Sequence, residues 1–343
     1  MASNPPRNMS VCRPLSVEVL ETRDVPTFGA FGGLSIAIGD VIQNGAVGPG
    51  NPAREYITGT GPGVEGRVRI WETSGRLLRE LTPFPGFTGG LNVAVGDVNN
   101  DGNDDIIVAP AAGGGPVVQV YNADGSLFKQ FLAYEVSFRG GVTLASGNVD
   151  GVPGDEIVTG SGNGGGPVVN IFSVLRGGLV RQKQILAYEP TFRGGVNVAV
   201  ADTDLNPTRQ EIITGVGNGG GPLVKVFTNT GSLLLSFFAF DPFLRTGVTI
   251  AAGNTESTPG AEIFTYAPGQ SSEIRVFDGR FGFSDGSFFP FPANYTNTIN
   301  MAIGDVNFDL RNDLAVVAGE GPVFQQPRLF FGGTTSPAGF NGP

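Results

Sequence analysis

Short apolar runs follow one another along most of the chain, and glycine, proline, asparagine or aspartate separates each run from the next. The runs are rich in β-branched and aromatic residues, which is typical of strands, and no segment has the period of an amphipathic helix. Four consecutive runs cover residues 142–145, 156–159, 168–172 and 184–187. The pattern predicts an all-β protein.

One of these runs recurs six times. Its clearest copy is Gly90-Leu-Asn-Val-Ala-Val-Gly96-Asp97, and the copies begin near residues 33, 90, 141, 195, 247 and 298. Each repeat of about fifty residues carries up to four predicted strands. Six such repeats predict a six-bladed β-propeller of four-stranded antiparallel blades. A solenoid of β-strands would need a shorter repeat.

The repeats also divide the chain. We expect an N-terminal tail over residues 1–14, the propeller over residues 33–333 and a C-terminal tail over residues 334–343. The sixth unit has no fourth apolar run. Residues 15–20 alternate apolar and polar side chains, so we predict that this strand, within the segment 15–32, completes the last blade and removes its open edge.

A candidate metal loop lies between the first and second predicted strands of unit two. Oxygen-bearing side chains stand at its positions 1, 3, 5 and 9, with glycine at position 6 for a sharp turn. This spacing matches the first nine positions of an EF-hand calcium loop, although no helices flank it. The predicted ligands are Asp97, Asn99, Asp101, the carbonyl of Asn103, and Asp105. An acidic turn without metal is the alternative.

The other units vary this loop. Unit six keeps the oxygen positions, with ligands Asp305, Asn307, Asp309, Arg311 through its carbonyl, and Asp313, but Leu310 replaces the glycine. Unit four is less regular, with one residue inserted, and offers Asp202, Asp204, Asn206 and Glu211. We expect the corresponding loops of units one, three and five to act only as turns.

The pattern Gly96-Asp97-Val-Asn99-Asn-Asp101-Gly102-x-x-Asp105-Ile-Ile-Val resembles the FG-GAP (VCBS-like) repeat. That repeat builds the propeller heads of integrin α subunits and of many bacterial surface proteins. The resemblance covers about residues 33–333 and implies that the loops of units two and six bind structural Ca²⁺. Residues 13–26 also resemble a short N-terminal motif of exported planctomycete proteins, which implies export by a non-standard route.

Two further signatures recur. Gly-rich loops end in proline, as in Gly217-Asn-Gly-Gly-Gly-Pro222, and each precedes a strand, so we interpret them as tight turns with several positive φ angles. Segments joining one blade to the next repeat an aromatic residue, a carboxylate and an arginine. We interpret them as inter-blade ion pairs with a packed aromatic, or as a ring of ligand pockets. Their residues are Tyr134, Glu135, Arg139, Tyr188, Glu189, Arg193, Asp241 and Arg245.

In a four-stranded meander, the loop between strands 1 and 2 (the 1–2 loop) and the loop between strands 3 and 4 (the 3–4 loop) lie on the same face of the ring. The metal loops are 1–2 loops, so they should lie on that face. The Gly-rich loops and the inter-blade segments should lie on the other face, where we expect a ligand, because loops on a rigid scaffold usually carry recognition. The ligand could be a protein or a glycan.

Composition narrows the function. The chain has 343 residues, no histidine and one cysteine, Cys12, which excludes Ser-His-Asp and Cys-His catalysis and an intramolecular disulfide. A formal charge of −10 disfavours nucleic acid. No apolar run is long enough for a transmembrane helix. The first twenty residues also lack the apolar core of a secretory signal.

We therefore expect a monomeric, non-enzymatic, calcium-stabilised propeller at the cell surface or outside the cell, acting in adhesion or ligand binding. A cytoplasmic location stays open. The alternatives are a lectin, a carbohydrate-active enzyme that uses carboxylates, and a structural surface-layer component.

Overall fold

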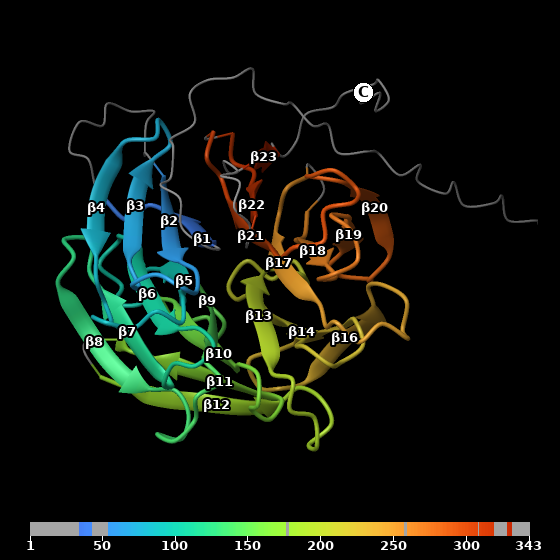
Figure 1. The fold of residues 1–343 in the computed structure, drawn as a ribbon, viewed down its shortest axis with the longest axis horizontal. Coiled ribbons are helices and arrows are strands. Elements are labelled where there is room, and N and C mark those ends of the chain that lie inside the picture. Colours follow the sequence, from blue (N-terminus) through green and yellow to red (C-terminus); the bar gives the residue numbers. More distant parts are fainter. Residues whose placement is uncertain are drawn as a thin grey trace, which may run out of the picture.

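The computed structural model describes residues 34–42, 54–175, 178–256, 259–307, 309–318 and 328–330. These residues form six antiparallel sheets arranged as blades around a central axis (Figure 1). No α-helix occurs in this part of the chain. The prediction of a six-bladed, all-β propeller is confirmed.

Five blades have four strands each, in sequence order from the axis outward. Blade one contains β1 (Leu34–Gly39), β2 (Glu55–Thr60), β3 (Val68–Glu72) and β4 (Leu77–Leu81). Blade two contains β5 (Leu91–Gly96), β6 (Asp105–Pro110), β7 (Val117–Tyr121) and β8 (Leu127–Leu132). Blade three contains β9 (Val142–Gly147), β10 (Glu156–Ser161), β11 (Val168–Ser173) and β12 (Val180–Leu186).

Blade four contains β13 (Val196–Ala201), β14 (Glu211–Val216), β15 (Leu223–Phe227) and β16 (Leu233–Phe238). Blade five contains β17 (Thr249–Gly253), β18 (Glu262–Tyr266), β19 (Ile274–Asp278) and β20 (Ser284–Phe288). The described part of blade six contains three strands, β21 (Ile299–Gly304), β22 (Asp313–Ala318) and β23 (Arg328–Phe330).

Burial follows the order of the strands. The second strand of blades one to five is buried at every residue, which explains its nearly continuous apolar sequence. The fourth strand is largely exposed, and β12 buries one of its seven residues. This exposure hides its start from the sequence pattern. The predicted run 184–187 covers only the end of a strand that begins at Val180.

The hydrophobic core is divided among the interfaces between blades. The cluster between blades two and three, for example, joins Ile107 and Val118 to Val142 and Ile157. First strands pack on one another all the way round, including β21 on β1, where Ile36 meets Ala302. The ring therefore closes through apolar packing. The predicted closing strand at residues 15–20 lies outside the described residues.

Candidate functional site

The two faces of the ring separate the loops as the meander requires. In blade two, the Asn99 carboxamide of the 1–2 loop donates to Asn122 Oδ1 of the 3–4 loop (3.3 Å). On the opposite face, the amide of Gly164 in a Gly-rich loop donates to the carbonyl of Arg193 in the following inter-blade segment (2.7 Å). The candidate metal loops and the candidate ligand-binding loops therefore lie on opposite faces.

The second strand of each blade begins with a buried carboxylate, and this carboxylate organises the metal-loop face. The six residues are Glu55, Asp105, Glu156, Glu211, Glu262 and Asp313. In each blade, one carboxylate oxygen accepts from at least one backbone amide of the preceding loop. Glu156 Oε2, for example, accepts from Val149 (3.1 Å) and Asp150 (3.3 Å). This carboxylate fixes the loop whether or not the loop holds a metal.

Burial has a second effect on these groups. It raises the pKa of Glu55, Asp105, Glu156 and Glu262 to about 7, because the loop amides compensate only part of the lost hydration. The pKa of Glu211 is also raised by burial. A buried carboxylate of this kind holds a proton more tightly than an exposed one does.

The loop of blade two is a closed hydrogen-bonded turn. Asp97 accepts from the amides of Asp101 and Gly102 (both 2.9 Å), and Asp101 accepts from the amide of Asn103 (2.9 Å). The Asn99 carboxamide nitrogen lies 3.1 Å from both Asp101 Oδ2 and Asp105 Oδ1. A nitrogen donor thus lies between the oxygens that were predicted to coordinate the ion.

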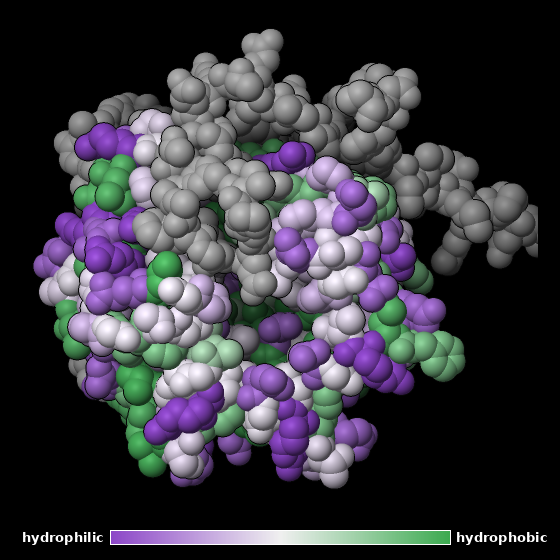
Figure 2. Space-filling view, in the orientation of Figure 1, coloured by the Kyte–Doolittle hydropathy of each residue, from purple (hydrophilic) through white to green (hydrophobic). Residues whose placement is uncertain are grey.

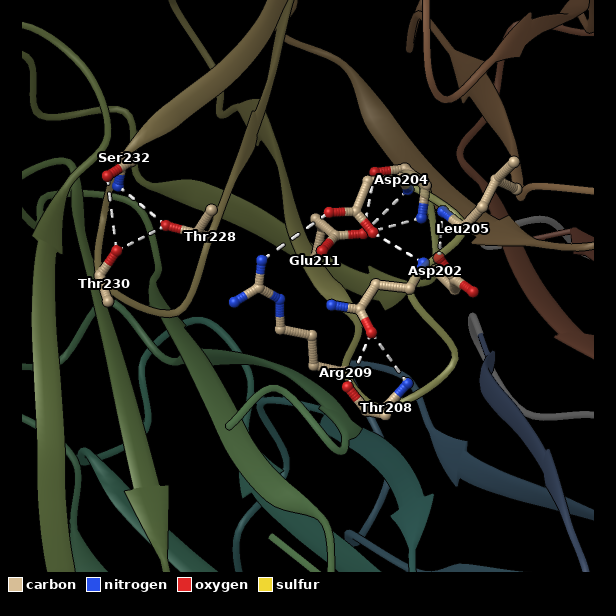
Figure 3. A network of polar contacts seen from close by, with 11 residues as sticks. Asp202, Asp204, Leu205, Thr208, Arg209, Glu211, Thr228, Thr230 and Ser232 are labelled. Atoms are coloured by element: carbon tan, nitrogen blue, oxygen red, sulfur yellow. Dashed lines mark hydrogen bonds and ion pairs between the residues drawn. The ribbon is translucent and has the colours of Figure 1, made fainter. Parts of the chain in front are cut away.

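Blade four brings its carboxylates closest together. Asp202, Asp204 and Glu211 each place an oxygen within 4.8 Å of the others, the one such acidic triad in the described part of the chain. Figure 3 shows Asp204 and Glu211 facing one another, with Asp202 beside them. Asn206, also a predicted ligand, turns its oxygen toward Thr208 instead (2.7 Å to the hydroxyl).

Two observations bear on whether a metal fits this triad. Glu211 Oε1 is buried and has no hydrogen-bond partner, so it can accept a cation without losing a contact. Arg209 Nη2 lies 3.9 Å from Asp204 Oδ2 and supplies a partly exposed positive charge beside the triad. The donor set of carboxylate oxygens suits a hard divalent cation, and the triad could bind a metal ion.

The loop of blade six resembles that of blade two. Asp309 accepts from the amide of Arg311 (2.9 Å), and Asp305 accepts from the amide of Leu310 (3.1 Å). Asn307 accepts from the amide of Asp309 (3.0 Å). Leu310 has a φ of 69° and is 95% exposed, so the backbone keeps the turn that glycine makes in blade two.

The sequence did not reveal how these loops join neighbouring blades. The amide of Asp155 donates to the carbonyl of Asp97 (2.8 Å), and Asp155 Oδ2 accepts from the amide of Asp97 (3.1 Å). Asp104 makes the same pair of bonds with Asp40 of blade one. In blades two to six, the residue before the second strand of the blade is therefore an inter-blade contact, which its fixed place in the repeat could have indicated.

On the opposite face, the aromatic residues of the inter-blade segments are structural. The Tyr188 hydroxyl bonds to the carbonyls of Thr214 (2.9 Å) and Leu223 (3.1 Å) in the next blade, and Tyr134 bonds in the same way to Thr159 and Val168. The packed-aromatic part of the interpretation is confirmed.

The predicted ion pairs in these segments are wrong. Within the described residues, none joins Glu135 to Arg139, Glu189 to Arg193 or Asp241 to Arg245. Each arginine instead donates to two carbonyls of its own turn, as Arg193 does to Pro190 (2.6 Å) and Phe192 (2.8 Å). Charge-assisted bonds to the backbone hold the turn without a carboxylate.

The Gly-rich loops owe their composition mainly to close packing. Only one glycine in each of the three loops, Gly113, Gly164 or Gly219, has a positive φ, fewer than predicted. Other glycines of these loops lie where backbones meet: a Cβ on Gly217 would lie 2.0 Å from the carbonyl oxygen of Gly194. The loop of one blade is thus seated directly on the inter-blade segment.

These loops surround a cavity of about 330 Å³ at the mouth of the central channel. Figure 2 shows the molecule hollowed at the centre of the ring. The cavity is lined by loops and first strands from blades two to five, including Asn92, Thr143, Asn197 and Thr249. Among the described residues that line it, none has an ionisable side chain, and the predicted ligand-face residues of the inter-blade segments are not among them.

Comparisons with known proteins add nothing beyond the fold. No family model matches the chain, and no curated protein matches it. Rhamnogalacturonan lyase YesW superposes with a TM-score of 0.45 at 11% identity, over 84% of this chain and 57% of that one. The Bacillus licheniformis rhamnogalacturonan lyase PL11 superposes with a TM-score of 0.48 at 14% identity, over 84% of this chain and 56% of that one. A Bacteroides caccae protein of unknown function superposes with a TM-score of 0.48 at 11% identity, over 80% of this chain and 88% of that one.

This chain spans less than two thirds of the length of those two lyases. Within the described ranges, no helix has the length and hydrophobicity needed to cross a bilayer.

Proposed function

We propose that this chain is a non-enzymatic interaction module that binds its ligand at the channel mouth. The observation that carries the proposal is the cavity itself, whose described lining combines neutral polar side chains with no ionisable group. Acid–base and nucleophilic catalysis need at least one such group beside the substrate. A site that has only neutral donors and acceptors is suited to binding.

We also propose that calcium stabilises the ring from the opposite face. The blade-four triad of Asp202, Asp204 and Glu211 fits a divalent cation, and the buried, unpartnered Glu211 Oε1 supports this. The resemblance to FG-GAP repeats adds blades two and six. There, Asn99 would have to turn its carboxamide oxygen toward the ion. Bound calcium would neutralise the buried carboxylates. It also favours an extracellular or cell-surface setting, in which the module would act in adhesion.

The proposal is tested by screening the full chain against arrayed glycans and extracellular matrix proteins, with product analysis of every bound candidate. Asn218 is exposed at the mouth, so Asn218→Trp blocks the cavity without disturbing the core. Thr230→Trp, in the exposed 3–4 loop drawn in Figure 3, is the matched control on the other face. We expect binding without turnover that only Asn218→Trp abolishes. Turnover, or equal binding by both variants, would contradict the proposal.

A further inference from the structure

The wall of the cavity includes neutral polar side chains at equivalent positions of four blades. One position at the start of each first strand holds serine, asparagine or threonine; it is the second residue of the strand except in blade five, where Thr249 is the first residue of β17. Four of these six residues, Asn92, Thr143, Asn197 and Thr249, line the cavity. The remaining two are Ser35 and Asn300. The wall is therefore built from a repeated position of the fold, not from a chance arrangement of loops.

Three of the four cavity-lining side chains are held by the neighbouring blade. Asn92 Nδ2 donates to the carbonyl of Val142 (2.8 Å), and Asn197 Nδ2 donates to the carbonyl of Val248 (2.8 Å). The Thr143 hydroxyl donates to the carbonyl of Val196 (2.6 Å). These bonds fix the side chains before any ligand arrives, which lowers the entropic cost of binding.

The same bonds leave capacity for a ligand. A carboxamide has two N–H donors and an accepting oxygen, and the inter-blade bond uses one donor. Asn92 and Asn197 each keep one N–H and the oxygen. Asn163 and Asn218 add two exposed carboxamides at the rim. The cavity thus offers at least four groups that can donate and accept at once.

From this arrangement we infer that the ligand is an uncharged saccharide unit, an inference that rests on the proposed function of the same site. A sugar hydroxyl donates and accepts, as these carboxamides do. A charged ligand would lose hydration without meeting an opposite charge, and an apolar ligand would leave the carboxamides unpaired. The cavity volume lies at the lower end of the range of about 300–1,000 Å³ for small-molecule sites, which fits one or two sugar rings.

The test is saturation-transfer NMR and calorimetry on the full chain with D-glucose, D-galactose, D-mannose, N-acetylglucosamine and their disaccharides at millimolar concentration. Glucuronate and glucosamine are the charged probes. We expect at least one neutral sugar to bind and both charged probes to bind at least about tenfold more weakly.

Variants locate the site. Asn218→Ala and Asn197→Leu should each weaken sugar binding about tenfold. Asn300→Leu is the matched control, because Asn300 occupies the same strand position in blade six and does not line the cavity. Asn218→Ala changes an exposed side chain, so it remains informative if Asn197→Leu destabilises the fold.

Three results would overturn the inference. They are that no neutral sugar binds, that the charged sugars bind as tightly as the neutral ones, or that Asn218→Ala leaves the affinity for the sugar unchanged. If the mouth binds a protein from the matrix panel and no sugar, only this inference fails. If the panel shows turnover or binding elsewhere, the proposed function fails with it.

Discussion

Loop position six shows how a single residue sets the geometry of these turns. Gly102 adopts a φ of 91° in blade two, and Leu310 adopts 69° at the same position in blade six. A leucine there strains the backbone by about 1–2 kcal/mol, and its exposed side chain gains no burial in return.

Leu310→Gly should therefore stabilise the protein. The relief of strain is partly offset by the larger backbone entropy of glycine in the unfolded chain, so we expect a net gain of up to about 1 kcal/mol. The measurement is urea unfolding monitored by fluorescence. Leu127→Gly is the control: Leu127 is exposed in β8 and has no positive φ, so the change should be neutral or destabilising. An unchanged or lower stability for Leu310→Gly would contradict the strain argument.

The buried carboxylates predict a pH dependence. In Glu156 the pKa is about 7 in the folded state because of burial, against a usual value of 4.5. The folded protein therefore holds a proton that the unfolded chain releases between these values. This stabilisation is fully present below about pH 4.5 and is lost as the pH rises through 7.

In excess EGTA, the melting temperature should fall between pH 5 and pH 8. Glu156→Gln keeps an oxygen for the loop amides and removes the charge, so it should flatten this part of the profile. Glu135→Gln, an exposed carboxylate outside these loops, should leave the profile unchanged. A melting temperature that rises over the same interval would show that the carboxylates are stabilised as anions.

At the level of elements, the blades are joined by close backbone contact. Gly194 packs against the carbonyl oxygen of Asn218, leaving no space for a methyl group, whereas a Cβ on Gly115 would meet nothing within 4 Å. Gly194 belongs to an inter-blade segment and Gly115 to a Gly-rich loop, and only Gly194 has no room for a Cβ.

Gly194→Ala should cost more than about 2 kcal/mol, because the neighbouring backbone must move. Gly115→Ala should change stability by less than about 0.5 kcal/mol. Thermal unfolding of both variants, compared with the unmodified chain, measures the difference. Equal effects would mean that the junction is looser than its contacts indicate.

Much of this element-level picture follows from the sequence. The repeat predicts the blades, because each unit must bury its strands against the next one. The start of β12 escapes prediction, because exposed outer strands carry polar side chains. The pattern also misleads at Glu189 and Arg193: their spacing indicates an ion pair, but turn geometry directs the guanidinium to carbonyls. The metal-loop spacing likewise favours blade two, whereas side-chain packing brings carboxylates together in blade four.

At the scale of the whole molecule, the charge and the cavity lie on different faces. Most of the acidic residues lie in the loops of the metal face or at the strand ends beside them, whereas the described cavity lining on the opposite face is neutral. Calcium bound as proposed would therefore not compete with the proposed ligand at the channel mouth.

Ring closure is the second whole-molecule question. The described part of blade six has three strands, and residues 15–20 remain the predicted fourth. Val17→Pro would remove a backbone donor from such a strand and should lower the melting temperature by several degrees. Val11→Pro, in the expected tail, is the control. Equal melting temperatures would leave residues 15–20 without a role in closure.

The most direct test of calcium stabilisation is thermal unfolding in millimolar calcium and in excess EGTA. A ligand held only by the native state adds about 2.7 kcal/mol at a free concentration one hundred times its Kd, which raises the melting temperature by several degrees. We predict such a rise, reduced by Asp204→Ala and by Asp101→Ala but not by the blade-three control Asp150→Ala. Superimposed curves with and without calcium would contradict the account and leave the loops as acidic turns.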